Sequence, residues 1–109
     1  MICKLKMFDT EYEVDARASE YSSNRRLAVV LYETGGIGEV FGILTVNLSH
    51  EPCPEGHAYI DTNNIPGAEK FIRDNKLGEF TGEFGFSGFC SYPLYRMNVE
   101  KMKGLEMMG

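Results

Sequence analysis

The chain has 109 residues, and 43% of them are hydrophobic, which fits one domain (residues 1–109) with a single core. Its formal charge of −5 argues against direct nucleic-acid binding and against an anionic membrane surface, because both need clustered Lys and Arg. No apolar run approaches the roughly 20 residues of a membrane-spanning helix.

The cysteines and the N-terminal residues indicate a compartment. Cys3, Cys53 and Cys90 are odd in number and widely spaced, so free thiols are the simplest interpretation. The first eight residues lack an apolar signal core and a cleavage site. We therefore expect a cytoplasmic protein.

The first half of the chain predicts strands. Apolar residues alternate with lysines in Ile2–Phe8, which predicts a half-buried edge strand, and Tyr12–Ala18 alternates in the same way. Leu27–Glu33 is apolar and β-branched and predicts a central strand. The glycines of Thr34–Gly38 suit a hairpin turn, after which Val40–Leu48 should return as one partner strand.

The second half predicts the main helix. A Pro-stiffened loop leads to a strand at Ala58–Asp61, and a helix with one apolar face should run from about Pro66 to a stop at Gly78. The fold-class prediction is therefore α+β, a mostly antiparallel sheet covered by one main helix.

An aromatic segment follows this helix. Residues Phe80–Tyr95 predict one or two strands, with Phe84 and Phe86 packed in the core and glycines allowing close approach. From about Asn98 the chain predicts a short helix or a frayed tail.

Asp61, Asn63 and Asn64 lie between the short strand and the helix. A helix N-terminus can bind anions, but Asp61 would repel them, and Asx side chains commonly bond local backbone to form corners. We therefore predict that these three residues are a structural corner.

The segment between residues 50 and 57 contains His50, Cys53 and His57. A structural zinc site needs four ligands, and two prolines restrict how this loop could surround an ion. A cysteine nucleophile would need a base within hydrogen-bond reach, which spacing alone does not establish. The prediction is a solvated loop with no metal, no cofactor and no catalytic residue.

A distinctive run of Asx, Gly and aromatic residues carries a family resemblance. The motifs are Ile60–Glu69, Leu77-Gly78, Thr81-Gly82 and Ser87–Tyr95, with the Tyr-Pro-Leu-Tyr run at the end. Over roughly Leu27–Tyr95 the chain resembles an uncharacterised family of small proteins carried by bacterial mobile elements such as conjugative transposons and prophages. The resemblance implies a bacterial, cytoplasmic, accessory role and supplies no catalytic residue.

The charge layout suggests an interaction surface. Residues 27–61 contain no Lys or Arg. Their five acidic residues are Glu33, Glu39, Glu51, Glu55 and Asp61. A surface of one sign can attract a basic partner, although it can also be a solvated face. The four glutamates are therefore predicted to bind a partner, with Tyr92 and Tyr95 as aromatic anchors.

Two classes of function follow. The first is a non-enzymatic interaction protein of a mobile element whose acidic surface occupies a basic protein groove, with an inhibitor of a host defence nuclease (anti-CRISPR-like) as the concrete version. The alternative is a small enzyme or ligand-binding domain that uses the His50, Cys53 and His57 loop or the Asp61 corner. The sequence indicates no oligomeric state.

Overall fold

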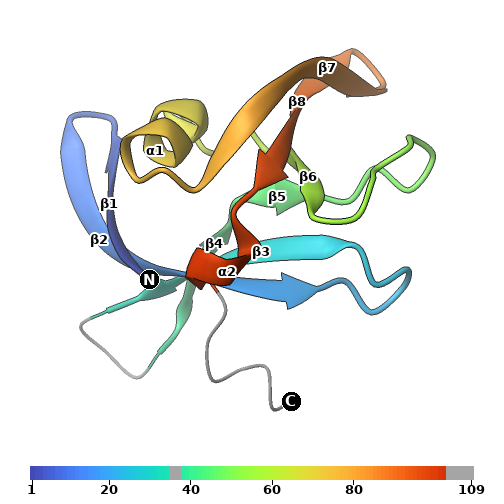
Figure 1. The fold of residues 1–109 in the computed structure, drawn as a ribbon. Helices are drawn as coiled ribbons and strands as arrows, with labels where there is room; N and C mark the ends of the chain where they lie inside the picture. Colours follow the sequence, from blue (N-terminus) through green and yellow to red (C-terminus); the bar gives the residue numbers. More distant parts are fainter. Residues whose placement is uncertain (35–37, 103–109) are drawn as a thin grey trace.

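A computed structural model describes residues 1–34 and 38–102, and strands dominate it (Figure 1). Strands make up 53% of the described residues and helices 11%. The elements, in chain order, are β1 (Ile2–Met7), β2 (Thr10–Glu20), β3 (Leu27–Glu33), β4 (Val40–Ile43), β5 (Thr45–Val46), β6 (His57–Ile60), α1 (Ala68–Asp74), β7 (Gly78–Ser87), β8 (Cys90–Met97) and α2 (Val99–Met102).

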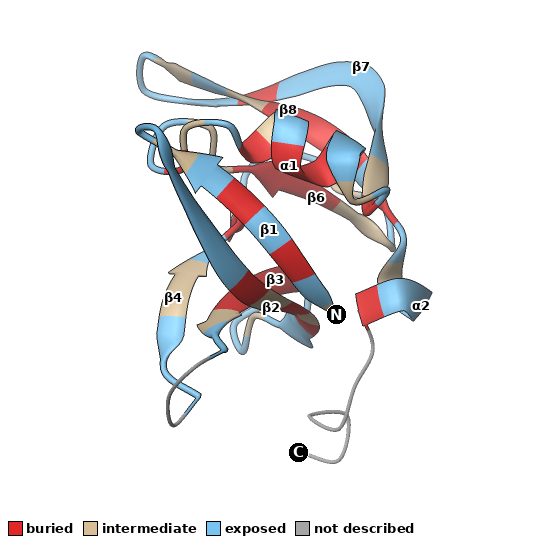
Figure 2. Ribbon diagram, turned by 90° about the vertical axis from the view of Figure 1, so that its left-hand side faces the viewer, coloured by how far each residue is buried: buried red, intermediate tan, exposed pale blue. Residues whose placement is uncertain are grey.

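The strands form two antiparallel sheets. Their strand orders are β1-β2-β3-β4 and β5-β6-β8-β7. Figure 1 shows α1 between the β1–β2 hairpin and the β7–β8 hairpin, and α1 contacts both β1 and β7. Buried residues from both sheets and from α1 pack into the main hydrophobic core, and Leu48, Tyr59 and Leu94 form a second, smaller cluster. Figure 2 shows the alternation of buried and exposed positions along β1 that this packing requires.

Leu44 joins the two sheets. Its N–H donates to the carbonyl of Val29 in the first sheet (2.9 Å), and its carbonyl accepts from the N–H of Asp61 beside the second (2.9 Å). Its side chain is fully buried. The single strand predicted for Val40–Leu48 is therefore wrong, because the chain changes sheets at Leu44 and forms β4 and β5.

The predicted fold class is also wrong. The fold is mostly β, and α1 is too short to cover a sheet. Gly67 at the N-terminus of α1 has φ +82°, so the helix begins after it and not at Pro66. Lys76 has a positive φ of 55°, which ends the helix well before Gly78. Sequence periodicity gave the position of the helix but not its length.

Two other predictions fall partly outside the described residues. β3 and β4 pair as an antiparallel hairpin, but residues 35–37 of the predicted turn lie outside the described part of the chain. In the C-terminal segment, predicted as a short helix or a frayed tail, the structure has the short helix α2 (Val99–Met102). Residues 103–109 also lie outside the described part of the chain.

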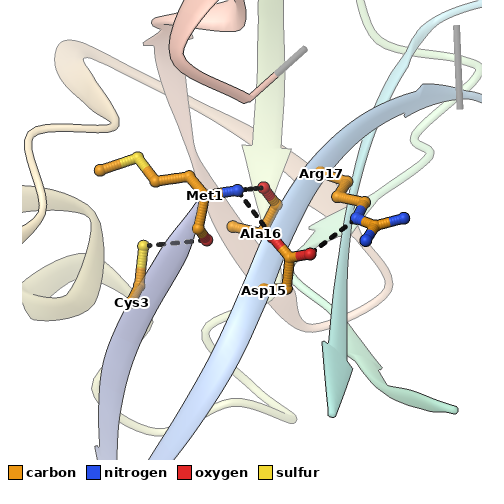
Figure 3. Close-up of polar contacts among 5 residues, drawn as sticks. All are labelled: Met1, Cys3, Asp15, Ala16 and Arg17. Atoms are coloured by element: carbon orange, nitrogen blue, oxygen red, sulfur yellow. Dashed lines mark hydrogen bonds and ion pairs between the residues drawn. The ribbon is translucent and has the colours of Figure 1, made fainter. Parts of the chain in front are cut away.

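Asp15 fastens the start of β1 to β2 (Figure 3). One carboxylate oxygen accepts from the α-ammonium of Met1 (2.6 Å) and the other from Nε of Arg17 (2.8 Å). Burial acts to raise the pKa of Asp15, but these two donors outweigh it and hold the pKa below its ordinary value. This contribution to stability is present above the ordinary carboxyl pKa and is lost as the pH falls through the lowered one.

Candidate interaction site on the β7–β8 hairpin

The β7–β8 hairpin extends beyond the helix that packs against its base. A seven-residue helix is about 10 Å long, whereas a ten-residue strand spans about 33 Å. In Figure 1 the turn of this hairpin lies well away from α1. The part of β7 toward the turn therefore has no helix over it.

Four exposed phenylalanines mark this hairpin. Phe80, Phe84 and Phe86 are each about half exposed, and Phe89 in the turn is fully exposed. We call these four residues the phenylalanine patch.

Three members of the patch share one face of the hairpin. Phe80, Phe84 and Phe86 lie opposite Tyr95, Pro93 and Ser91 of β8. Opposed residues share a face, and so do alternate residues of one strand. The rings of Phe80 and Phe84 meet edge to face, with their centroids 5.4 Å apart. The result is a preformed aromatic strip along one side of the hairpin.

The predicted core packing of Phe84 and Phe86 is wrong, and Gly85 gives the reason. Gly85 is buried on the opposite face, where a Cβ atom would lie 2.6 Å from Tyr59 and 2.9 Å from Leu48. The hairpin meets the small cluster of Leu48, Tyr59 and Leu94 through this glycine, so the two flanking phenylalanines lie on the other face of β7. The sequence signal that could have revealed the patch is a glycine at the inward position between two phenylalanines.

The loop before β6 holds the outer edge of β7. His50 donates from Nε2 to the carbonyl of Phe86 (2.6 Å), and Glu51 accepts the Phe86 N–H through Oε2 (2.8 Å). Both backbone groups of Phe86 are thereby paired, although β7 is the edge strand of its sheet. These contacts fix the backbone from which the aromatic strip projects.

The charge around the phenylalanine patch is weakly negative. Between Thr81 and Tyr95 the only charged residue is Glu83, which is exposed. Glu51 adds a second carboxylate next to Phe86, and at the base of the hairpin Glu79 pairs with Arg96. A partner with Lys or Arg beside an apolar surface would match this layout.

The two predicted tyrosine anchors do not form this surface. Tyr95 is buried behind Phe80 and donates its hydroxyl to Glu69 of α1 (2.6 Å), so its assignment to partner binding is corrected. Burial and the Glu69 carboxylate both raise the pKa of the Tyr95 hydroxyl. Tyr92 is half-buried, lies opposite Gly85 and accepts a hydrogen bond from Asn63 (3.3 Å).

The predicted acidic face is divided. Glu33 and Glu39 flank the β3–β4 turn, where the Glu33 N–H donates to the Glu39 carbonyl (2.8 Å). Glu51 and Glu55 belong to the loop between β5 and β6, which Figure 1 shows on the other side of the molecule. The four glutamates therefore do not form one surface, because the two loops lie on opposite sides of the molecule. Of the four, Glu51 lies beside the phenylalanine patch.

The structure places Asp61, Asn63 and Asn64 in one corner. Asp61 accepts from the N–H of Asn64 (3.2 Å) and from its side-chain amide (2.9 Å), and its own carbonyl accepts from Ile65 (3.1 Å). Asn63 extends from the same corner and donates to Cys90 Sγ (2.8 Å). These bonds tie the end of β6 to the approach to α1 and to the β7–β8 hairpin.

We expect Asp61→Ala to destabilise the protein by about 1–2 kcal/mol, because it removes two hydrogen bonds to a charged acceptor at an exposed site. Asn64→Ala should cost less, since it keeps the backbone N–H that donates to Asp61. Thermal unfolding of both variants tests this order. Unchanged melting for both would show that the corner does not support the fold.

His50, Cys53 and His57 do not converge. His50 bonds Phe86, Cys53 donates to the carbonyl of His57 (3.2 Å), and His57 Nδ1 bonds the carbonyl of Glu55 (3.0 Å). Over residues 1–34 and 38–102, no three His, Cys, Asp or Glu side chains are grouped closely enough to hold an ion. Burial raises the pKa of the Cys53 thiol despite the nearby Arg26, which disfavours the thiolate that a nucleophile needs.

We expect protein purified without chelator to contain far less than one zinc ion per chain, because each of these side chains bonds a separate carbonyl group. Elemental analysis measures this directly. Stoichiometric zinc in the wild type, lost in His57→Ala, would contradict it.

The geometry can now be set beside known proteins. A family model described as "Domain of unknown function (DUF4313)" matches residues 16–109. The chain belongs to this family. The match extends further in both directions than the Leu27–Tyr95 resemblance, and it includes the whole phenylalanine patch. No curated protein matches, and neither does any solved structure.

No helix within residues 1–34 and 38–102 has the length and apolar character needed to cross a bilayer.

Proposed function

We propose that this protein is a non-enzymatic binding protein that docks the phenylalanine patch of its β7–β8 hairpin onto another protein. The observation that carries the proposal is the exposure of four phenylalanines on one hairpin. Isolated exposed apolar residues are normal, but a contiguous group marks an interaction surface. Aromatic residues also provide much of the binding energy at protein interfaces.

The rigidity of the hairpin supports the same proposal. His50 and Glu51 pair the Phe86 backbone, and Gly85 packs against Tyr59 and Leu48. A preorganised surface loses less conformational entropy on binding than a mobile one. The patch is therefore ready to bind without rearrangement.

The partner we propose has Lys and Arg beside an apolar surface, because Glu51 and Glu83 border the patch. The specific form of this proposal is that the protein belongs to a bacterial mobile element and inhibits a host defence nuclease by occupying its nucleic-acid groove. The resemblance to mobile-element proteins motivates that form. In this proposal Glu51 and Glu83 attract the basic partner, in place of the single acidic face expected from the sequence.

Affinity capture from bacterial lysate tests the proposal when it is run with matched variants. Wild-type protein should retain a specific partner that Phe84→Ser/Phe86→Ser loses and that elutes with increasing salt. The control is Phe8→Ser, since Phe8 is 80% exposed but lies in the β1–β2 turn. A partner lost equally in the control, or retained by the double variant, would contradict binding through the patch.

A further inference from the structure

A groove runs along β4 and β5 on a different part of the molecule. It has a volume of about 580 Å³ and lies between these strands and the corner that precedes α1. Its lining includes Phe41, Ile43 and Val46 from the strands and Asp61, Asn64 and Ile65 from the corner. Its size is within the usual range for ligand sites.

The groove lies beside an open sheet edge. β4 is the last strand in the order β1-β2-β3-β4, and Figure 2 shows it at the margin of the molecule, partly exposed. The N–H of Leu44 donates to Val29 of β3. Because backbone groups alternate in direction along an antiparallel strand, the N–H and C=O of the preceding Ile43 point toward the open edge.

β4 is only four residues long, but it lacks the protection that the longer edge strands β1 and β7 have. β1 carries exposed Lys4 and Lys6, and the backbone of β7 is paired at Phe86 by His50 and Glu51. β4 has no charged residue, and its Val40 and Ile43 are about half exposed. Natural proteins block edge strands with charges, bulges or coverings, so an apolar edge indicates a strand-pairing site. The bulge of β4 lies at its start, before Gly42 and Ile43.

The lining also indicates the sign of the ligand charge. Asp61 is the only charged residue that lines the groove, and no Lys or Arg does so. Its carboxylate is held in place by the amide and the N–H of Asn64. A second copy of this chain fits poorly, because β4 is Val-Phe-Gly-Ile and a second β4 strand would bring no Lys or Arg toward Asp61.

We propose that the groove binds an extended peptide segment of a partner protein that alternates apolar and basic residues. The peptide adds as a further strand to β4 and pairs with the backbone of Ile43. Its apolar side chains contact Phe41 and Ile65, and a Lys or Arg reaches Asp61. Backbone pairing gives affinity in this mode, and the side-chain sites give specificity.

Amide chemical shifts of isotope-labelled protein test this with a capped seven-residue peptide of alternating lysine and valine. We expect saturable shifts in β4, β5 and the Asp61 corner, and at least about tenfold weaker binding of the matched glutamate–valine peptide. Asp61→Asn, which keeps an acceptor for Asn64, should weaken the lysine peptide severalfold. Ile43→Pro, which removes the outward N–H, should abolish its binding, whereas Phe86→Ser should leave it unchanged.

Three outcomes would overturn the proposal. These are an absence of saturable shifts in β4, equal affinity for the two peptides, and shifts confined to the β7–β8 hairpin. Concentration-dependent shifts of β4 without peptide would show that a second copy of the chain occupies the edge instead. If Ile43→Pro does not fold, the Asp61→Asn comparison and the glutamate peptide decide the question on their own.

Discussion

Replacing Phe84 and Phe86 together by serine should weaken partner binding by about 100-fold or more. Each ring is about half exposed in the free protein and is available for burial at an interface. Loss of a central aromatic residue typically costs about 2 kcal/mol or more, and two adjacent losses exceed the effect of one. The affinity of the captured partner for the wild type and the variant measures the effect.

The fold should tolerate this change. The two side chains are about half exposed and do not belong to the buried core, so the free energy of unfolding should fall by no more than about 1 kcal/mol. Phe8→Ser serves as the matched control, since it removes an equally large exposed ring outside the patch. Equal affinity of the double variant and the wild type would mean that the patch is not the binding surface.

Leu44→Ala should destabilise the protein by about 2–5 kcal/mol, the usual range for truncating a buried leucine. Leu44 is fully buried where the chain passes from the first sheet to the second. The cavity would open between the sheets, where its backbone bonds Val29 and Asp61. Chemical denaturation with the linear extrapolation method gives the change.

Ile43→Ala is the matched control for this substitution. Ile43 is the adjacent residue but is 45% exposed, so its truncation should cost no more than about 1 kcal/mol. If both variants lost the same stability, Leu44 would have no special role in joining the sheets.

Local patterns predicted many strands of this fold. Alternation identified β1 from its buried Cys3 and Leu5, and the β-branched run identified β3. The Asx residues predicted the corner that Asp61 and Asn64 form. Each of these features depends on neighbouring residues, which is why the sequence was sufficient.

The errors concern features that depend on distant contacts. The apolar pattern is continuous through Leu44, so nothing local indicates that β4 and β5 join different sheets. The predicted helix was too long because its start depends on the backbone conformation of Gly67 and its end on that of Lys76. The predicted core packing of Phe84 and Phe86 was wrong because Gly85, and not the phenylalanines, faces Leu48 and Tyr59.

The candidate site followed from sequence only in part. Charge counting found Glu51, but it also grouped this residue with Glu33 and Glu39 on the other side of the molecule. Tyrosine is a common interface anchor, yet the hydroxyl of Tyr95 donates a hydrogen bond to Glu69 of α1 inside the protein. Burial on a given strand face depends on which segment lies over it, and composition does not specify that.

Hydrogen exchange of the protein, alone and bound to its captured partner, tests the central claim most directly. The account predicts new protection of the backbone amides between Gly82 and Tyr92, where the patch and its turn lie. The amides near Glu33 and Glu39 should exchange as in the free protein. Protection at the β3–β4 end, with no change in the β7–β8 hairpin, would contradict the proposal that this protein binds through the phenylalanine patch.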